Sequence, residues 1–386
     1  MLTAIVGINW GDEGKGRMVD LLSSDYDIIC RYQGGNNAGH TVVNDRGKFI
    51  LNLLPSGILR ETTVNIMGNG MVIDIEHLVN EAGKLREQGI KITPDNLKIS
   101  DKAIICLPYH RLMDIMEEDR LADKKFGSTR RGIAPVYADK YMKKALRMED
   151  LLDMDSLYEK VKDIVEWKNI TVKGYGHEPV DADEIMDWLK KYGSEVAPYI
   201  TDVSEYLYQA AAEGRNIMFE AQLGALRDID FGIYPYTSSS TTLASFAPIG
   251  AGVPGLTLTG TLGIMKAYST CVGEGPFTVE MSGDEAEALR KAGGEYGAAT
   301  GRPRRVGAFD IPASKYGVRV QGATEIALTK LDVLSYMDKI PVCTAYEIDG
   351  IKTTAFPTGQ RLLRAKPVIE YLPGFGDVSK CRTYEE

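Results

Sequence analysis

The sequence is poor in cysteine and histidine and has no long hydrophobic run. Its five cysteines are scattered and never form a CxxC pair, which argues against a zinc site or a disulfide framework and favours reduced thiols in the cytoplasm. No stretch reaches the roughly 18 consecutive apolar residues that a membrane helix needs, and no basic leader precedes the apolar N-terminal segment. Basic residues number 45 against 54 acidic ones, and the net charge of −9 disfavours extended binding to nucleic acid. We therefore expect a cytoplasmic protein with neither a membrane nor a nucleic acid as partner.

What is present is an ordinary globular composition, with 386 residues, 44% hydrophobic and 26% charged. Short β-like runs alternate with helical ones, which predicts an α/β fold with a large, mainly parallel central sheet flanked by helices. The strand-like runs are residues 2–9, 27–32, 63–67, 216–220, 255–267 and 325–331. Between about residues 101 and 214 the pattern is mainly helical, with apolar residues three and four apart in 181–192 and 197–212. Because no linker divides the chain, we predict a single domain over 1–386 that contains a helical subdomain at about 101–214.

The first strand leads into a glycine loop, WGDEGKG (10–16), and then into a helix. Such a loop offers backbone N–H groups and a helix N-terminus to a phosphate, with Lys15 adding charge. It departs from the ordinary P-loop, because Asn9 and Gly16 stand where that motif has glycine and Ser or Thr. The hydroxyl that normally holds magnesium is missing, so Asp12 could hold the metal or act as a base. The loop alone is equally compatible with a structural turn in which Asp12 caps the helix.

Three further segments carry candidate chemistry. RYQGGNNAGHT (31–41) follows a strand and contains His40, one of only four histidines. Active sites of open α/β sheets lie in loops of this kind, which favours a catalytic role for His40, although a lone histidine is more often structural. TGRPRR (300–305) holds three arginines that match carboxylate or phosphate oxygens, unless it is a solvated basic patch. In TKLD (329–332), the Asp332 carboxylate could accept the N–H donors of guanine while the Lys330 side chain lies along the base. Taken alone, this four-residue sequence is common and is only weak evidence for a guanine site.

Together, in this order and spacing, these segments resemble adenylosuccinate synthetase. Further motifs carry the resemblance: LPSGIL (54–59), GSTRRGIAPVYADK (127–140), FEAQLGALRDIDFG (219–232), YPYTSSSTT (234–242), KAYSTCVGEGPF (266–277) and LTKLDVL (328–334). It extends from residue 5 to about residue 374 and implies the family's α/β fold with a P-loop-like GTP site. It also implies a carbon–nitrogen ligase of purine biosynthesis (EC 6.3.4.4) that joins L-aspartate to IMP with GTP and Mg²⁺, giving adenylosuccinate, GDP and phosphate. The purine 6-oxygen would first be phosphorylated and then displaced by the aspartate amine.

The resemblance also implies roles for individual residues. Asp12 is expected to remove the N1 proton and, with the Gly39 carbonyl, to bind one Mg²⁺ per subunit, while His40 is the acid in γ-phosphoryl transfer. The expected GTP-binding residues are Gly11, Asp12, Glu13, Gly14, Lys15, Gly16, Arg17, Gly39, His40, Thr41, Arg304, Lys330, Leu331 and Asp332. The expected IMP-binding residues are Asp12, Lys15, Asn37, Ala38, Gly39, His40, Thr129, Lys143, Leu223, Ser238 and Arg302. The expected aspartate-binding residues are Ala298, Ala299, Thr300, Gly301, Arg302 and Arg304.

The chain departs from the family pattern around IMP. The family is a homodimer that lends an arginine to the neighbouring subunit's IMP phosphate, and Lys143 stands in its place, which keeps the charge without the bidentate fork. The other departures are Arg130 for glycine, Leu223 for glutamine (with Gln222 one residue earlier), Arg227 for leucine, Ser238 for threonine and Cys271 for arginine. Two explanations stay open: compensating exchanges in a pocket for IMP, or a pocket for another 6-oxopurine nucleotide such as GMP or dGMP.

The family continues beyond the YLPG segment (371–374) into a helix and a turn that closes over guanine, whereas this chain ends at Glu386. We therefore expect either a truncated chain or a guanine site that is closed in another way. A third alternative is a GTP-binding regulator with impaired catalysis. The presence of both Asp12 and His40 favours an enzyme, since a regulator has no chemical need of the two.

Overall fold

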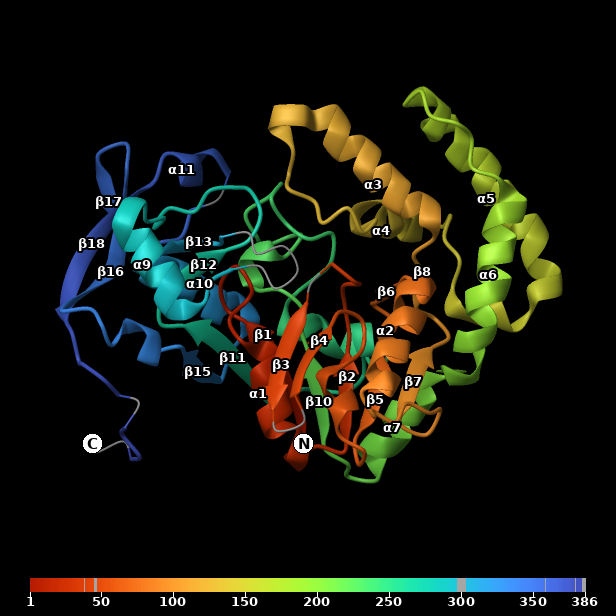
Figure 1. Cartoon of the computed structure of the whole chain (residues 1–386), viewed down its shortest axis with the longest axis horizontal. Coiled ribbons are helices and arrows are strands. Elements are labelled where there is room, and N and C mark those ends of the chain that lie inside the picture. Colours follow the sequence, from red (N-terminus) through yellow and green to blue (C-terminus); the bar gives the residue numbers. More distant parts are fainter. Residues whose placement is uncertain (38, 45–46, 297–302, 358, 379, 384–386) are drawn as a thin grey trace. The chain divides into compact units, whose positions relative to one another are not determined.

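The computed structural model describes residues 1–37, 39–44, 47–296, 303–357, 359–378 and 380–383 (Figure 1). Its largest element is a sheet of eight strands, with parallel pairings such as β1–β10, β10–β2, β2–β5 and β11–β15. The strand order is β15 (Glu325–Thr329), β11 (Gly260–Lys266), β1 (Leu2–Gly7), β10 (Ile217–Glu220), β2 (Ile28–Arg31), β5 (Val64–Met67), β7 (Leu97–Ser100) and β9 (Ile200–Thr201). The prediction of a large, mainly parallel sheet flanked by helices is confirmed.

The six strand-like runs of the sequence correspond to β1, β2, β5, β10, β11 and β15, each shorter by one or more residues. The apolar stretch 197–212 is not one helix, however. A 3₁₀ turn, Ala197–Tyr199, and β9 precede α7, which covers only Val203–Ala212. The reason is local: Pro198 has no N–H donor, and Ile200 and Thr201 are β-branched.

The chain divides into two compact units, which we call unit 1 and unit 2. Unit 1 comprises Met1–Ile5, Gly16–Gln222 and Ser238–Thr259. Unit 2 comprises Val6–Lys15, Leu223–Thr237 and Gly260–Glu386. The division cuts the glycine loop and helix α1 (Lys15–Leu22) between Lys15 and Gly16, so the expected phosphate-binding residues come from both units.

Unit 1 carries most of the helices. They are α1, α2 (Ile75–Glu87), α3 (Pro108–Leu121), α4 (Ile133–Met142), α5 (Met154–Gly174), α6 (Ala182–Val196), α7 and α8 (Ala247–Ala251). Two further strand pairs are β3 (His40–Asn44) with β4 (Gly47–Leu51), and β6 (Val72–Ile73) with β8 (Ile104–Ile105). Helices α2, α5, α6 and α7 each begin after an aspartate whose carboxylate accepts a first-turn N–H: Asp74, Asp153, Asp181 and Asp202. Such caps set where each helix starts.

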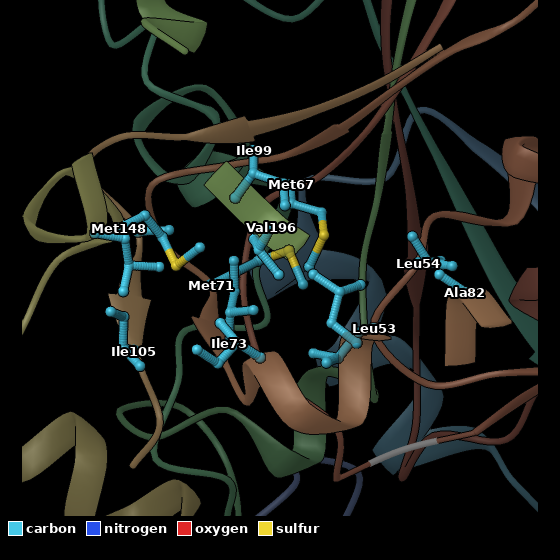
Figure 2. Packing of buried hydrophobic residues seen from close by; sticks show 14 of the residues in the cluster. Leu53, Leu54, Met67, Met71, Ile73, Ala82, Ile99, Ile105, Met148 and Val196 are labelled. Carbon is cyan, nitrogen blue, oxygen red and sulfur yellow. The ribbon is translucent and has the colours of Figure 1, made fainter. Parts of the chain in front are cut away.

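The core of unit 1 is apolar and is shown in part in Figure 2. Side chains from β5, β7, α2 and α6 meet in it, among them Met67, Ile99, Ala82 and Val196. Truncating a fully buried leucine such as Leu53 to alanine typically costs about 2–5 kcal/mol, because the lost burial is added to the cavity left behind. This packing holds β5 and β7 against α2 and α6.

A buried polar cluster joins α3, α4 and α5. His110 Nε2 lies 2.9 Å from Asp139 Oδ2, and Lys168 forms an ion pair with the other oxygen of the same carboxylate. The Leu107 N–H donates to His110 Nδ1 at 2.9 Å, which places the ring proton on Nε2. Burial lowers the pKa of His110 below its ordinary value. The cluster is a neutral histidine and an ion pair that tie the three helices together.

Unit 2 contains a smaller sheet of β14 (Phe309–Asp310), β16 (Lys339–Ile348), β17 (Ile351–Thr353) and β18 (Lys366–Pro373). An antiparallel pair of β12 (Ser269–Cys271) and β13 (Arg305–Gly307) places Cys271 opposite Arg305. The helices are α9 (Gly283–Gly293), α10 (Ile311–Gln321) and α11 (Gly359–Leu363). Within the described ranges no helix is both long and apolar enough to cross a membrane.

We expect Asp310 to make stability depend on pH. It caps α10 and receives the Tyr346 hydroxyl at 2.7 Å, and burial raises its pKa from 3.8 to about 6. Because the folded-state pKa exceeds the unfolded one, this carboxyl favours folding most at low pH, and the contribution is lost as pH rises through about 6. When the pH is lowered from 8 to 5, the free energy of unfolding measured in urea should rise by about 1 kcal/mol more in wild type than in Asp310→Asn. Equal gains in the two proteins would contradict the assignment.

Candidate functional site

The glycine loop after β1 is held from within by Glu13, which is buried. Its Oε1 accepts the N–H groups of Asn9 at 3.1 Å and Gly11 at 2.8 Å, and its Oε2 lies 2.8 Å from Lys15 Nζ. A carboxylate thus takes the loop's N–H donors and its lysine, as a phosphate oxygen would. Three loop residues have a positive φ: Gly11 (100°), Asp12 (64°) and Gly14 (98°).

The Asp12 carboxylate meets two cationic side chains on one of its oxygens. Arg304 Nη1 lies 2.8 Å from Oδ2, and Lys266 Nζ lies 3.3 Å from it. Both cations also pair with the buried Glu295, at 2.8 Å each. Burial raises the pKa of Glu295, but Lys266, Tyr268 and Arg304 outweigh burial and hold it below its ordinary value. Two residues that the sequence singled out, Asp12 and Arg304, are therefore in direct contact in unit 2.

The TKLD segment lies at the end of β15. Thr329 Oγ1 donates to the Glu13 carbonyl at 2.8 Å, which ties this segment to the glycine loop. Lys330 has a φ of 62° and donates from Nζ to the Gly293 carbonyl at 2.8 Å. Leu331 and Asp332 are exposed. The expected phosphate-binding and guanine-reading residues of unit 2 thus belong to connected segments.

In unit 1, His40 begins β3 and is held by Glu220 at the end of β10. His40 Nδ1 lies 2.7 Å from Glu220 Oε1, and the fully buried Glu220 also accepts the Ser56 N–H at 2.8 Å and the Ser56 hydroxyl at 2.6 Å. Burial raises the pKa of Glu220, but His40, Arg31 and Ser56 outweigh it and lower it overall. A carboxylate beside Nδ1 fixes the orientation of the imidazole ring.

The start of α1 also packs against this histidine. A Cβ at Gly16 would lie 3.0 Å from His40 Cβ, so glycine permits the close approach. Arg17 donates from Nη1 to the Val43 carbonyl at 3.0 Å, next to the same strand pair. Gly39 and Thr41, on either side of His40, are exposed.

The other expected nucleotide-binding residues of unit 1 are spread over four segments. Asn37 accepts the Gly35 N–H at 3.2 Å, and the buried Ser238 lies 3.1 Å from Ser240 Oγ. Thr129 is exposed between α3 and α4, and Lys143 is exposed at the end of α4. The remaining expected site residues lie outside the described part of the chain: Ala38, Ala298, Ala299, Thr300, Gly301 and Arg302.

Arg227, which departs from the family pattern, is a structural clamp. The residue is 8% exposed, and its guanidinium donates to the carbonyls of Tyr236, Val272 and Glu274, with Nη2 also 3.1 Å from Cys271 Sγ. A guanidinium that is engaged in this way has little capacity left to read a base. The two departures at positions 227 and 271 are therefore in contact with each other.

Gln222 and Leu223, which depart from the family pattern at neighbouring positions, lie in different surroundings. Gln222 is buried and donates from Nε2 to the Gly35 carbonyl at 2.7 Å, so it supports the loop that leads to His40. Leu223 is partly exposed and has a φ of 62°, which is uncommon for a residue with a Cβ. Its carbonyl would lie 2.5 Å from a Cβ at Gly7, so its backbone is packed against the strand that carries the glycine loop.

Sequence reasoning missed three buried charged residues: Glu220, Lys266 and Glu295. Glu220 and Lys266 each end an apolar run, IMFE (217–220) and LGIMK (262–266), whereas Glu295 follows two glycines. Burying a charge is costly unless it is paired. A charged residue that ends a buried strand was therefore the signal available for Glu220 and Lys266.

The glycine loop of unit 2 offers an oxygen ligand that fits a magnesium ion. Mg²⁺ prefers oxygen ligands and is usually bound by one or two carboxylates together with substrate phosphates and water. In unit 2, the Asp12 carboxylate, on a side chain that is 34% exposed, is an oxygen donor of this kind. Within the described ranges, no three His, Cys, Asp or Glu side chains gather into a protein-only metal cage.

Comparison with known proteins settles the family. The family model for adenylosuccinate synthetase matches residues 4–386. The chain belongs to the adenylosuccinate synthetase family. An adenylosuccinate synthetase from Halothermothrix orenii is 47% identical over 383 residues, which are 98% of this chain and 89% of that protein. A fully ligated adenylosuccinate synthetase structure from Plasmodium falciparum is 33% identical and covers 99% of this chain and 91% of its own, with a TM-score of 0.92.

A more distant structure shows the fold alone. It is a succinoaminodeoxyadenylate synthetase from cyanophage S-2L, solved with dGMP and dATP. It is 20% identical, with a TM-score of 0.59 over 86% of this chain and 87% of its own.

As an adenylosuccinate synthetase family member, this chain is a carbon–nitrogen ligase of purine biosynthesis, as the sequence predicted. It joins L-aspartate to IMP with GTP as co-substrate and Mg²⁺ as cofactor. The alternatives drawn from the sequence, a GMP or dGMP pocket and a regulator without activity, are not favoured.

Proposed function

We propose that Asp12 and His40 carry out the chemistry of this ligation, one as the base on IMP and the other as the acid on the γ-phosphoryl group. The observation that carries the proposal is the 2.7 Å contact between His40 Nδ1 and the buried Glu220. A histidine held in this way donates from Nε2, and its acid form is supported where charge develops on a phosphoryl oxygen.

The reaction proceeds in two steps, phosphorylation of O6 and its displacement by the aspartate amine. Asp12 takes the proton from N1 of IMP, the electron pair moves to O6, and O6 attacks the γ-phosphorus. The bond from the γ-phosphorus to the bridging oxygen breaks, and GDP leaves while His40 stabilises the transferring group. The aspartate amine then attacks C6, phosphate departs with O6, and the nitrogen loses a proton to give adenylosuccinate. The first step is needed because an unmodified 6-oxygen is a very poor leaving group.

The other predicted residues fall into binding roles. Asp12 and the Gly39 carbonyl would hold Mg²⁺, which would supply positive charge to neutralise the phosphoryl group in transfer. Lys15 and the N-terminus of α1 hold GTP phosphates, and Lys330 with Asp332 reads guanine. Asn37, Thr129 and Ser238 contact IMP. Residues 298–302, together with Arg304, bind aspartate.

The proposal includes a cytoplasmic homodimer in which Lys143 reaches the neighbouring subunit's IMP phosphate. Its support is the exposed position of Lys143 at the end of α4. The helical subdomain at about 101–214 within a single domain stays a prediction. Mixing an Asp12→Asn chain with a Lys143→Ala chain tests the exchange, because mixed dimers regain one complete site only if Lys143 acts across the interface.

A product assay by mass spectrometry tests the proposed function. The protein is supplied with GTP, Mg²⁺ and L-aspartate, and IMP, GMP and dGMP are offered separately. The expected result is a succinyl adduct from IMP together with equal amounts of GDP and phosphate. An adduct formed mainly from GMP or dGMP, or no adduct at all, would overturn it.

Arg227 supplies a test of the compensating exchange. We expect Arg227→Leu to lower the free energy of unfolding by about 3 kcal/mol, because it leaves buried carbonyls without donors. Adding Cys271→Arg should recover most of this loss, since a guanidinium then approaches the same carbonyls from β12. Urea unfolding measures both, with the exposed Arg361→Leu as the matched control. A change in the preference for IMP over GMP in Arg227→Leu would contradict the purely structural role.

A further inference from the structure

Lys266 is buried at the end of β11, and its ammonium group uses its three donors inside unit 2. Nζ lies 2.8 Å from Glu295 Oε1, 3.0 Å from Thr270 Oγ1 and 3.3 Å from Asp12 Oδ2. The residue is 5% exposed. A buried ammonium is tolerated only when its N–H groups are satisfied, so three acceptors around one nitrogen hold it in a single place.

Glu295 supplies the opposite charge from behind. It is fully buried, and its Oε1 receives Lys266 Nζ together with the Tyr268 hydroxyl at 2.5 Å. Its Oε2 receives Arg304 Nη1 at 2.8 Å, and the Arg304 N–H donates to the Glu295 carbonyl at 3.0 Å. The buried Glu295 carboxylate thus forms ion pairs with both cationic side chains that contact Asp12. The charges of Asp12, Glu295, Lys266 and Arg304 sum to zero, which allows the group to lie in a protein interior.

We propose that Lys266 and Glu295 are positioning residues for the Asp12 carboxylate. Among the residues that the structure describes, both cationic partners of Asp12 approach Oδ2. This arrangement fixes the rotation of the carboxylate and leaves Oδ1 as the oxygen that takes the N1 proton. The Asp12 side chain is one-third exposed, so its orientation depends on its ion pairs with Lys266 and Arg304. The inference rests on the proposed role of Asp12, and neither Lys266 nor Glu295 touches substrate in it.

A merely structural role would give a different kinetic result from a positioning role. If Lys266 only held β11 to the β12–β13 strand pair, its loss would loosen all nearby binding residues. KM would then rise, and the unfolding temperature would fall. If it orients Asp12, ground-state binding survives and the transition state is destabilised, so kcat falls while KM changes little. Misplacement of a reacting group by about 1 Å costs on the order of 100-fold in rate.

The experiment compares Lys266→Met, Glu295→Gln and the double variant by steady-state kinetics, IMP binding and thermal unfolding. Each single variant should lose roughly 100-fold in kcat, with KM for IMP and GTP and the Kd for IMP within about threefold of wild type. The kcat of the double variant should fall no further than that of either single variant, because both changes remove the same support for the Asp12 carboxylate. Lys291→Met, an exposed lysine on α9, is the matched control and should behave as wild type.

Three outcomes overturn the inference. The first is a kcat within twofold of wild type in the single variants, and the second is a rise in their KM as large as the fall in their kcat. The third is a fall in the kcat of the double variant equal to the product of the two single effects. Tyr268→Phe provides a variant that keeps both cations on Asp12 and removes only one donor to Glu295. It should lose less than about fivefold in kcat, and a loss as large as that of Lys266→Met would also count against the inference. Asp12→Asn is measured in parallel. If Asp12→Asn is fully active, it is the proposed function that fails; if only Asp12→Asn is impaired, the positioning role fails.

Discussion

Asp12→Asn is expected to lower kcat by at least about 10⁴-fold, the largest effect of any single change in this chain. An amide cannot take the N1 proton, and it is a poor ligand for Mg²⁺. It also leaves Lys266 and Arg304 facing a neutral group where the carboxylate accepted both at Oδ2. The loss therefore combines a missing base, a weakened metal site and an unbalanced pair of cations.

Rapid-quench measurement of GDP formation with saturating IMP and GTP separates this effect from binding. The exposed Asp187→Asn on α6 carries the same chemical change far from the glycine loop in sequence and should leave the rate unchanged. A drop of less than tenfold in Asp12→Asn would contradict its role as the base.

His40→Asn is expected to lower kcat by about 10²–10⁴-fold while nucleotide binding persists. The amide can still accept or donate a hydrogen bond, but it cannot carry the proton that the transferring phosphoryl group requires. Glu220→Gln should lose less, about 10-fold to 100-fold, because it keeps the ring and removes only the charge that supports its acid form.

The contact between His40 and Glu220 predicts non-additivity. With His40 already replaced, Glu220→Gln should cost little more, since the carboxylate acts on the reaction only through the ring. The exposed His177→Asn is the control for the loss of a histidine. Undiminished turnover in His40→Asn, or independent losses for His40 and Glu220, would contradict the assigned roles.

Much of the fold could be predicted because its signals are local. Apolar runs such as 27–32 and 63–67 end in glycine or polar loops, and they became β2 and β5 with small changes in their bounds. The error at 197–212 shows the limit of periodicity. Apolar spacing continued through Pro198 and Ile200, while the backbone chemistry of those residues ended the helix and placed β9 there.

The candidate site could be predicted only where a residue belongs to a motif with a known chemistry. Asp12 and His40 were visible because they lie in glycine-rich loops after strands. Glu295 was not, because its partners Lys266 and Arg304 are 29 and 9 positions away and meet it only in the folded unit. The contact between Arg227 and Cys271 was not predicted for the same reason, because the two residues are 44 positions apart in the sequence.

Labelled oxygen gives the most direct test of the central claim, that this chain activates IMP at O6 and then displaces it with aspartate. IMP labelled with ¹⁸O at position 6 is converted with GTP, Mg²⁺ and L-aspartate, and the phosphate released is analysed by mass spectrometry. We expect one ¹⁸O atom in each phosphate formed and none in adenylosuccinate at C6. Phosphate without label, formed in step with adenylosuccinate, would contradict the account.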